Sequence, residues 1–366
     1  MQSSICRWGI MGAANIARKN WKAIRNAGNA SLVAVASRDQ SRAQLFIDEC
    51  FADTPLPAAP VPCSYEDLLK RSDIDAVYIP LPTGIRPEWV IRAAQSGKHV
   101  LSEKPCGSTA ADVRAMIDAC RQYHVQFMDG VMFMHSRRLD VLRRTLDDGE
   151  SVGDIRRITS QFSFLGADEF LKQNIRVSQE LEPLGCLGDL GWYNVRFTLW
   201  ALGYQMPERV SGRILSAHGR GDSSSAVPTE FSAELYYPGG VSASFYCSFR
   251  TENHQWANVA GTKGYLHVPD FVLPFFGAEN AFEVHHNVFR NHGCDFNMER
   301  HTKRHTVREY SNSTADSQET KMIREFSRIA KSGKLEPIWG EIALKTQQVV
   351  DACMRSARED GKLATV

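Results

Sequence analysis

The first third of the chain alternates short apolar runs with stretches of helical periodicity. Residues 6–11 (CRWGIM) form the first apolar run. A helical pattern begins at Asn15, and its apolar positions Ile16, Ile24 and Ala27 are predicted to share one face. A second helical pattern at 86–97 would end at Gly97. A third at 108–123 begins with Thr109 as its predicted N-cap and Asp112 three residues later, which resembles a capping box. Further apolar runs lie at 31–39, 74–82 and 98–105. This order is typical of βαβ units, so we predict a parallel sheet that closes near residue 130.

The turn after the first strand carries the small residues Gly12, Ala14 and Ala17. Their spacing resembles the Gly-x-Gly-x-x-Gly/Ala fingerprint of dinucleotide-binding turns, with alanine at the second glycine position. Ligands of doubly wound sheets lie at the carboxyl ends of the strands, where the amides of a helix N-terminus can bind a pyrophosphate. This stretch alone leaves open whether the turn binds a dinucleotide or only joins a strand to a helix.

The second predicted strand ends at Ser37 and Arg38. A site for NAD would offer a carboxylate there, to bind the hydroxyls of the adenosine ribose. A hydroxyl and a guanidinium suit a ribose 2′-phosphate instead, because arginine can bind a phosphate through two hydrogen bonds. The pair therefore favours NADP over NAD, while an ordinary solvated surface arginine is the alternative interpretation.

Beyond residue 130 the helical spacing gives way to alternation of apolar and polar residues. Two strands are predicted on either side of the turn PGG, with alternating side chains at Phe231, Ala233, Leu235 and Tyr237 and at Val241, Ala243, Phe245 and Cys247. We therefore expect a largely antiparallel sheet. Segments 219–228 and 311–320 are expected to be exposed loops or locally disordered, and loops at 166–184 and 269–300 are expected to shape a pocket.

These patterns predict an α/β chain of two domains, as its length of 366 residues also favours. An N-terminal Rossmann domain at 1–130 would bind the dinucleotide. A C-terminal α+β domain at 131–366 would be built on a largely antiparallel open sheet. A closing helix at 340–360 could pack back towards the first domain, and its apolar stripe is Ile342, Thr346, Val349, Val350 and Cys353.

The composition excludes several classes of partner. Lys and Arg (43) nearly balance Asp and Glu (42), so no general basic field favours nucleic acid or an anionic membrane. No apolar stretch approaches the ~20 residues of a membrane helix. The nine cysteines form no Cys-x-x-Cys pair, and the first strand begins too early to follow a signal peptide, so we expect a cytoplasmic protein. The eleven histidines show no metal-ligand spacing, and no metal is expected.

Three motifs point to one family. The opening turn, LSEKP at 101–105 and GCLGDLGWYNV around Asp189 together resemble the glucose-fructose oxidoreductase / inositol dehydrogenase family, known as Gfo/Idh/MocA. The resemblance covers nearly the whole chain, and Glu-Lys-Pro at this distance from the turn is its most specific mark. The stretches GIMGAANIARK, YIPLPT, FMDG and LGDLGWY look most like its NADP-dependent sugar (xylose-type) and dihydrodiol dehydrogenases.

The resemblance implies roles for four side chains. Lys104 matches the active-site lysine beside the nicotinamide, Asp189 matches the carboxylate that holds substrate hydroxyls, and Tyr193 matches the proton-transfer residue. Arg176 resembles a position near the substrate. Asp189 and Tyr193, four residues apart on a helix, can face one cleft. A phenol with a pKa near ~10 needs an adjacent ammonium to become a good base, and Lys104 could supply that charge. Without the resemblance, Tyr193 would be interpreted as a packed aromatic and Arg176 as a surface arginine.

The remaining expectations concern cofactor and partners. The predicted cofactor contacts are Gly12, Ala14, Asn15, Ile16, Ser37, Arg38, Pro80, Leu81, Thr83, Glu103 and Lys104. Thr83 would line the nicotinamide side. Arg86 stands where relatives often have histidine, with an effect that the sequence leaves open. The open face of the sheet implies, by resemblance, a homodimer.

The sequence therefore predicts an NADP-dependent oxidoreductase that interconverts CH–OH and C=O groups of a small carbohydrate or cyclic diol. One alternative is a glycoside-cleaving enzyme of the same family, which oxidises its substrate transiently and regenerates its cofactor. The other alternative is a nucleotide-binding sensor without catalysis. Such sensors tend to lose part of the Lys, Asp and Tyr set, and here Lys104, Asp189 and Tyr193 are all present.

Overall fold

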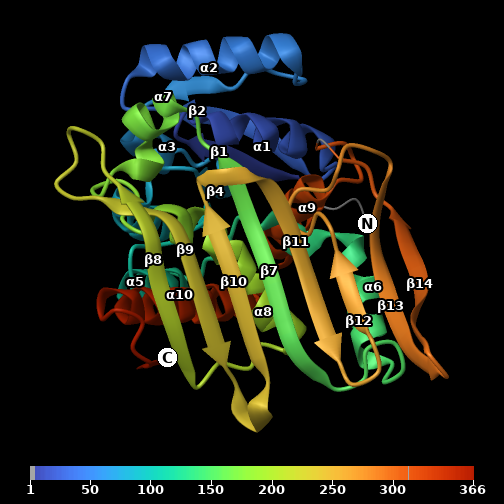
Figure 1. Cartoon of the computed structure of the whole chain (residues 1–366). Coiled ribbons are helices and arrows are strands. Elements are labelled where there is room, and N and C mark those ends of the chain that lie inside the picture. Colours follow the sequence, from blue (N-terminus) through green and yellow to red (C-terminus); the bar gives the residue numbers. More distant parts are fainter. Residues whose placement is uncertain (1–4, 312) are drawn as a thin grey trace. The chain divides into compact units, whose positions relative to one another are not determined.

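The computed structural model describes residues 5–311 and 313–366, and the chain folds into two compact units (Figure 1). Unit 1 comprises Met1–His135, Glu180–Pro183 and Ser311–Gln348. Unit 2 comprises Ser136–Gln179, Leu184–Tyr310 and Val349–Val366. No helix among the described residues is long and apolar enough to cross a membrane.

Unit 1 is built on a six-stranded parallel sheet with the strand order β3-β2-β1-β4-β5-β6. Its strands are β1 (Cys6–Met11), β2 (Ala30–Ala36), β3 (Val61–Cys63), β4 (Ala76–Ile79), β5 (His99–Ser102) and β6 (Phe127–Asp129). This is the order of a Rossmann fold, whose strand order reverses between β1 and β4. The predicted N-terminal fold is confirmed.

Helices connect and cover these strands. They are α1 (Asn15–Asn26), α2 (Gln40–Asp53), α3 (Tyr65–Lys70), α4 (Arg86–Gln95), α5 (Ala110–Gln122) and α9 (Gln318–Ser332), with short 3₁₀ turns η1 (Thr83–Ile85) and η2 (Met132–His135). The predicted capping box of α5 is present, because Thr109 and Asp112 bond each other's backbone amides. Gly97 follows the end of α4 with a left-handed φ of 70°, as expected of a helix stop.

The expected apolar face of α1 is partly wrong. Ile16 is 37% exposed, and Ala27 lies just past the helix as its C-cap. The buried side chains include Ala17, Trp21 and Ile24. Because successive residues are about 100° apart around a helix, Ile16 points away from the face that these three share.

The expectation of an exposed loop at 311–320 is wrong in part. The described residues before α9 form a loop, but most of them are not exposed, and residues 318–320 belong to α9. Asn312 lies outside the described residues. Ser317 caps α9 by accepting a hydrogen bond from the Thr320 amide, and the Thr320 hydroxyl donates to the Ser313 carbonyl. Ser317 and Thr320 are fully buried. The segment is polar because hydroxyl groups satisfy the backbone groups at a buried helix start.

Unit 2 is built on a nine-stranded sheet with the order β14-β13-β12-β11-β7-β10-β9-β8-β15. Among the described residues only β7 and β10 run parallel in it, so the predicted largely antiparallel sheet is confirmed. Its strands are β7 (Ile155–Leu165), β8 (Arg209–His218), β9 (Val227–Tyr236), β10 (Ser242–Ser248), β11 (Arg250–Gly261), β12 (Tyr265–Val268), β13 (Glu279–His292), β14 (Asp295–Arg308) and β15 (Ala364–Thr365).

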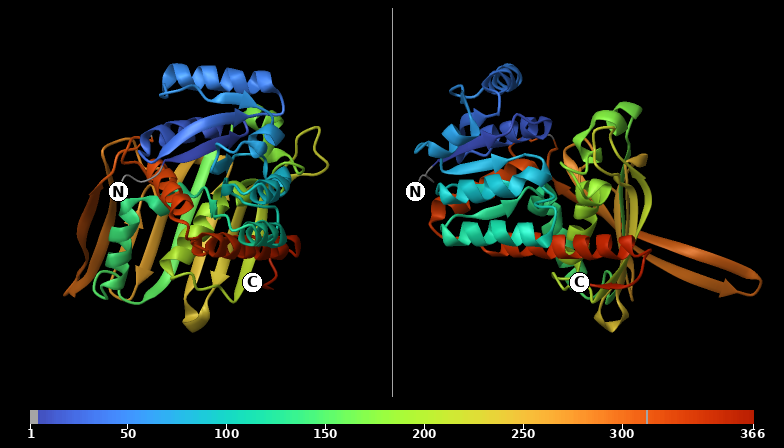
Figure 2. Two further views of the ribbon diagram at one scale, coloured as in Figure 1. Left: turned by 180° about the vertical axis from the view of Figure 1, so that it is seen from behind. Right: turned by 90° about the vertical axis from the view of Figure 1, so that its left-hand side faces the viewer.

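Helices lie on one face of this sheet and leave the other face open (Figure 2). They include α6 (Arg137–Asp147), α7 (Asp168–Gln173) and α8 (Trp192–Ala201), which packs on β7 and β10. The predicted alternation is observed, since Phe231, Leu235 and Phe245 are buried on the helix-covered face. The turn PGG forms η5 (Pro238–Gly240).

The expectation of a loop throughout 269–300 is wrong for its second half. Strands β13 and β14 form a hairpin there, with a regular register from Glu279 opposite Arg308 to His292 opposite Asp295. Its long polar stretches carry little apolar alternation, which is why the sequence pattern did not predict strands. The loop expected at 219–228 is present from 219 to 226.

The closing helix is α10 (Ile338–Arg358), and its predicted stripe is buried at Ile342, Thr346, Val349, Val350 and Cys353. Within unit 1 the start of α10 lies against α5, because a Cβ on Gly340 would stand 3.2 Å from a methylene of Ile117. Residues 349–358 of the helix belong to unit 2.

Candidate active site

The turn after β1 presents backbone groups at the carboxyl edge of the unit 1 sheet. The Gly12 amide donates to the Ala36 carbonyl at 2.9 Å, and Gly12 adopts a φ of 127° that favours glycine. A Cβ there would lie 3.1 Å from the Leu81 side chain and 3.6 Å from Pro80. Ala14 begins α1 without any side-chain cap, so the amides of the first turn can meet an anion.

The structure therefore brings the predicted contacts Gly12, Pro80 and Leu81 together. Asn15 and Ile16 are exposed in the first turn of α1, at the same edge. Two strand ends and one helix start thus meet where a doubly wound sheet binds its ligand.

The end of β2 offers an exposed arginine, and the carboxylate that follows it caps a helix. Ser37 is buried and donates its amide to the Cys63 carbonyl, whereas Arg38 is exposed. The next residue, Asp39, caps α2 by accepting from the Ser41 amide at 2.9 Å and from the Ser41 hydroxyl at 2.8 Å. These hydrogen bonds lower the pKa of Asp39. The acidic group next to Arg38 in the sequence therefore serves as the N-cap of α2.

Lys104 lies in the loop that follows β5, between Glu103 and Pro105, which both make hydrogen bonds to other parts of unit 1. Glu103 is buried, and its carboxylate accepts from the Tyr78 hydroxyl at 2.6 Å and from the Lys104 amide at 3.2 Å. Burial, followed by the nearby Glu103 charge, raises the pKa of Tyr78 well above its usual range. A Cβ on Gly130 would lie 3.1 Å from the Glu103 carboxylate, so a glycine there leaves space for it.

Arg86 holds this loop in place through its backbone carbonyls. Its side chain is 3% exposed, and it donates to the Leu81 carbonyl and to the carbonyls of Glu103 and Pro105, on either side of Lys104. The guanidinium thereby ties the end of β4 to the lysine loop. This is the structural effect of Arg86 that the sequence left open.

Thr83 is fully buried and bound by a residue that the sequence analysis missed. Its hydroxyl donates to the Glu182 carboxylate at 2.6 Å, and its amide donates to the same carboxylate at 3.1 Å. The neighbouring Gly84 donates its amide to the Leu181 carbonyl, and a Cβ on Gly84 would lie 2.1 Å from the Glu180 carbonyl oxygen. No local sequence pattern marks Glu182, because its partner is 99 residues away.

In unit 2, the structure brings Arg176 and Asp189 together. The Arg176 guanidinium donates to the Asp189 carboxylate at 2.7 Å. Asp189 lies in a π-helical turn, η4 (Leu187–Gly191), which leads directly into α8. Such turns are often found at functional sites. The side chain of Arg176 is 37% exposed and that of Asp189 is 12% exposed, so the pair is accessible to a ligand from the Arg176 side.

Tyr193 follows in the first turn of α8 and is 6% exposed. Its ring packs edge-to-face on Phe162 of β7, with 5.6 Å between ring centres. Phe162 could be found in the sequence from the alternation in RRITSQFSF. Trp192, beside Tyr193, is fully buried, as expected of a core aromatic.

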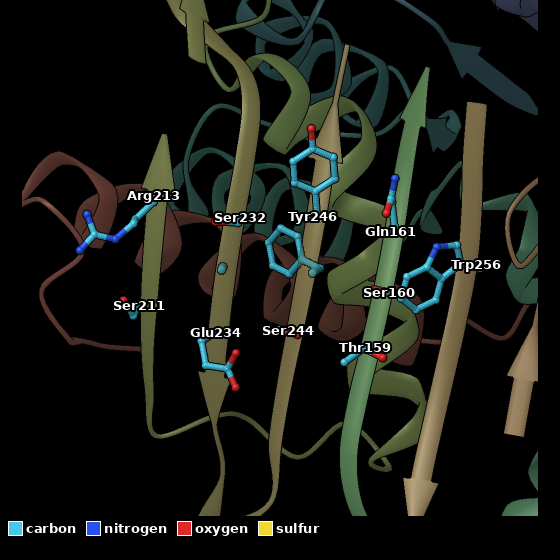
Figure 3. A pocket seen from close by; sticks show the side chains of 12 residues that line it. Thr159, Ser160, Gln161, Ser211, Arg213, Ser232, Glu234, Ser244, Tyr246 and Trp256 are labelled. Atoms are coloured by element: carbon cyan, nitrogen blue, oxygen red, sulfur yellow. The ribbon is translucent and has the colours of Figure 1, made fainter. Parts of the chain in front are cut away.

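A separate concavity of about 490 Å³ lies on the open face of the unit 2 sheet (Figure 3). Its lining includes Thr159, Gln161, Glu234, Ser244, Tyr246 and Trp256. On β7 these residues alternate with Phe162, whose ring contacts Tyr193. Because adjacent side chains of a strand point to opposite faces, the concavity and Tyr193 lie on opposite sides of the sheet.

Comparison with protein families gives two matches. Residues 6–131 match the oxidoreductase family with an NAD-binding Rossmann fold, GFO_IDH_MocA, and residues 140–267 match the GFO/IDH/MocA C-terminal domain. Together these segments span more than half of the chain.

Three curated relatives resemble the chain over different lengths. A dTDP-3,4-didehydro-2,6-dideoxy-alpha-D-glucose 3-reductase of Saccharopolyspora spinosa is 36% identical, over 52% of this chain and 54% of that protein. The match thus spans about half the length of that relative. D-xylose 1-dehydrogenase (NADP(+)) 2 of Haloferax volcanii is 33% identical over 71% of this chain and 74% of its own. Trans-1,2-dihydrobenzene-1,2-diol dehydrogenase of Mus musculus is 33% identical, over 73% and 76%.

A solved structure also resembles the fold. It is KijD10, a 3-ketoreductase from Actinomadura kijaniata in complex with NADP and TDP-benzene. The TM-score is 0.79 and the sequence identity 26%, over 96% of this chain and 98% of that one.

Proposed function

We propose, from the premise that the chain belongs to the GFO/IDH/MocA oxidoreductase family, that it is an NADP-dependent enzyme acting on a sugar or a cyclic diol. It would interconvert a CH–OH group of that substrate with a carbonyl. The observation that carries the proposal is the Arg176–Asp189 ion pair, whose carboxylate lies one helical turn before Tyr193. The proposal is supported because a carboxylate that could bind substrate hydroxyls and a phenol that could transfer a proton follow one another along η4 and α8.

The residues at the edge of the unit 1 sheet fit a dinucleotide with a 2′-phosphate. Gly12 leaves the turn without a side chain, and the first turn of α1 has no side-chain cap to compete with a phosphate. Arg38 is exposed, while Asp39 caps α2. The Haloferax relative is named for NADP(+), and the KijD10 structure holds NADP, which supports the same choice of cofactor.

When bound, the nicotinamide supplies or accepts the hydride. Tyr193 gives or takes the proton of the reacting oxygen, since that oxygen must exchange a proton as the hydride moves. Lys104 provides an ammonium for the reacting oxygen, and a positive charge also favours a phenolate. Asp189, held by Arg176, accepts hydrogen bonds from substrate hydroxyls.

Two further proposals concern assembly and location. We propose a homodimer that pairs through the open face of the unit 2 sheet, whose side chains are polar but form a shallow concavity. We also propose a cytoplasmic location, on the basis of the scattered cysteines in the sequence.

The test of the proposed function is an assay of aldoses, inositols and trans-dihydrodiols with NADP⁺ and NAD⁺, and of the matching carbonyl compounds with NADPH. We expect net cofactor turnover with at least one substrate class and a preference for the phosphorylated cofactor. Glycoside cleavage without net turnover would favour the glycoside-cleaving alternative. Tight NADPH binding without any turnover would favour the sensor.

A further inference from the structure

Unit 2 carries a hairpin that continues well beyond its neighbouring strand. β12 pairs with β13 only from Glu283 to His285, whereas β13 and β14 continue together to the turn at Gly293 and Cys294. We call residues 286–304 the hairpin arm. The right-hand view of Figure 2 shows it projecting from the sheet on the side away from α8. Nearly all of its residues are exposed.

The hairpin arm has one apolar face. Phe289 lies opposite Met298, and Phe296 is diagonal to Phe289, with 5.8 Å between the two ring centres. Because side chains alternate along each strand, all three point to the same face of the ribbon. Phe289 is 57% exposed, Met298 is 63% exposed and Phe296 is 69% exposed. Isolated two-stranded ribbons are marginally stable in water, so this apolar face favours a covering partner.

This face is continuous with the open face of the sheet. Phe289 shares its side of β13 with Glu283, which pairs with His267 of β12. His267 pairs with Asn258 of β11, which pairs with Thr159 on the concave open face. Directly opposed residues point to the same side of a sheet. The apolar face of the arm and the open face of the sheet are therefore the same side of one continuous sheet. A molecule that packs on the open face would also contact the arm.

We propose that the hairpin arm clasps a second copy of this chain seated on the open sheet face, with Phe289, Phe296 and Met298 as its anchors. This inference rests on the homodimer proposed above and names the segment that secures it. Every copy carries both an arm and an open face. A two-fold pairing therefore lets each arm reach the other copy at the same time.

The charges of the arm favour this partner over a nucleic acid or an anionic membrane. Its four cations, Arg290, Arg300, Lys303 and Arg304, accompany the two carboxylates Asp295 and Glu299. Three of these cations already have carboxylate partners. Arg290 binds Glu299 at 3.2 Å on the face opposite the three anchors, Arg304 binds Glu279 at 3.2 Å, and Arg300 lies 4.0 Å from Glu283. The anchoring face is thus apolar with a limited positive charge, as at the core and rim of a protein interface.

The test compares dimer dissociation constants by sedimentation equilibrium of the full chain. The double variant Phe289→Ser/Phe296→Ser should raise the dissociation constant at least ~10-fold, because two aromatic side chains lose their burial. Val288→Ser is the matched control, since Val288 is an exposed apolar residue on the opposite face of the arm. It should change the constant by less than about twofold. Circular dichroism and the thermal midpoint verify that each variant is folded.

The outcomes separate the arm from the dimer and from the enzyme. A dimeric wild type whose dissociation constant is unchanged in the double variant overturns the clasp and leaves the homodimer intact. A wild type that stays monomeric at tens of micromolar (about the usual assay range) overturns both, whatever its activity. Arm-dependent binding of DNA or anionic vesicles by a monomer also overturns the clasp, in favour of those partners.

Cys294, at the tip of the arm, offers a second measurement. It is exposed, whereas the other eight cysteines are buried. If the arm clasps a second copy, the rate at which Cys294 reacts with a thiol reagent should fall as the wild-type concentration rises. The double variant should lose that dependence. A wild-type rate independent of concentration, across a range in which the dimer forms, overturns the clasp.

Discussion

The two groups of candidate catalytic residues are held in different ways. In unit 1, the loop of Lys104 is fixed through its backbone, because Arg86 binds the carbonyls on both sides of the lysine. In unit 2, Asp189 is held through its side chain, by an ion pair with the partly exposed Arg176. A substitution below the lysine loop should therefore disturb a whole segment. A substitution at Arg176 should remove one ion-pair partner of the Asp189 carboxylate.

The difference follows from burial. Arg86 is enclosed, so its guanidinium must be satisfied by protein groups, and backbone carbonyls supply them. The side chain of Arg176 is 37% exposed, so water can replace much of the stabilisation that its ion pair gives to the Asp189 carboxylate. We therefore expect that replacing Arg86 in unit 1 lowers both activity and folding stability. Replacing Arg176 in unit 2 should lower activity with little loss of stability.

The largest effect on activity should come from replacing Tyr193, the proposed proton-transfer residue of unit 2. Tyr193→Phe should lower kcat by roughly 10²- to 10⁴-fold, the usual contribution of acid–base catalysis. The dissociation constant of NADPH should stay near that of the wild type. Lys104→Met should lower kcat at least as much, and the double variant should lose less than the product of the two, as for residues that act as one unit. Steady-state kinetics with a competent substrate measures all three variants, and near wild-type kcat in Tyr193→Phe would make the tyrosine a packing residue.

The next effect tests the backbone-held loop of unit 1. Arg86→Met leaves the carbonyls of Leu81, Glu103 and Pro105 buried without this donor, and should lower the free energy of unfolding by about 2–4 kcal/mol. It should also lower kcat, because the carbonyls that flank Lys104 lose their anchor. Urea denaturation and kinetics of the same preparation check both effects.

Arg92→Met is the matched control for Arg86, since it lies in the same helix α4 but is partly exposed. Its ion pairs with Glu66 and Glu88 are near the surface, so the expected loss of stability is below about 1 kcal/mol. If both variants behave alike, the loop does not depend on Arg86, and the contrast between the two units disappears.

Much of the fold was accessible to sequence patterns because those patterns are local. The apolar run of β1, the capping box at Thr109 and the alternation around Phe231 each reflect a rule that acts within a few residues. Polar segments were harder. The buried start of α9 at Ser317 and the arm around Phe289 carry polar sequences, and their structure depends on partners remote in the chain or on the facing strand.

The same distinction applies to the candidate site, where some features follow from local patterns and others depend on contacts between distant segments. Gly12 and Lys104 lie at strand ends, where a predicted parallel sheet brings them to one edge without further information. The contacts of Glu182 with Thr83, and of Arg86 with Pro105, join segments that no periodicity relates. Such contacts require the packed backbone, so the sequence indicated where the ligand edge lies but not what holds it in place.

A smaller effect is expected at Arg38, the exposed member of the unit 1 edge. Arg38→Ala should weaken NADP(H) binding by about 1.5–3 kcal/mol, the range for a hydrogen bond to a charged group. NAD(H) binding should hardly change, and the free energy of unfolding should stay within about 0.5 kcal/mol of the wild type, as for a surface position. Titration calorimetry with both cofactors measures this. Equal losses for the two cofactors would show that Arg38 does not contact the 2′-phosphate.

The smallest effect should come from Arg176, and it tests the side-chain-held site most directly. Arg176→Met removes the guanidinium that orients the Asp189 carboxylate, and should raise the substrate KM by about tenfold, equivalent to 1.4 kcal/mol. The free energy of unfolding should change by less than about 1 kcal/mol, because the pair is partly solvated. Arg176→Lys should recover part of the loss, since an ammonium restores the charge but not the fixed geometry of a guanidinium. Because the proton-transfer phenol is untouched, kcat should fall less than KM rises. A loss confined to kcat would mean that Arg176 acts on the chemical step, and a large loss of stability would mean that unit 2 ties its site to folding as unit 1 does.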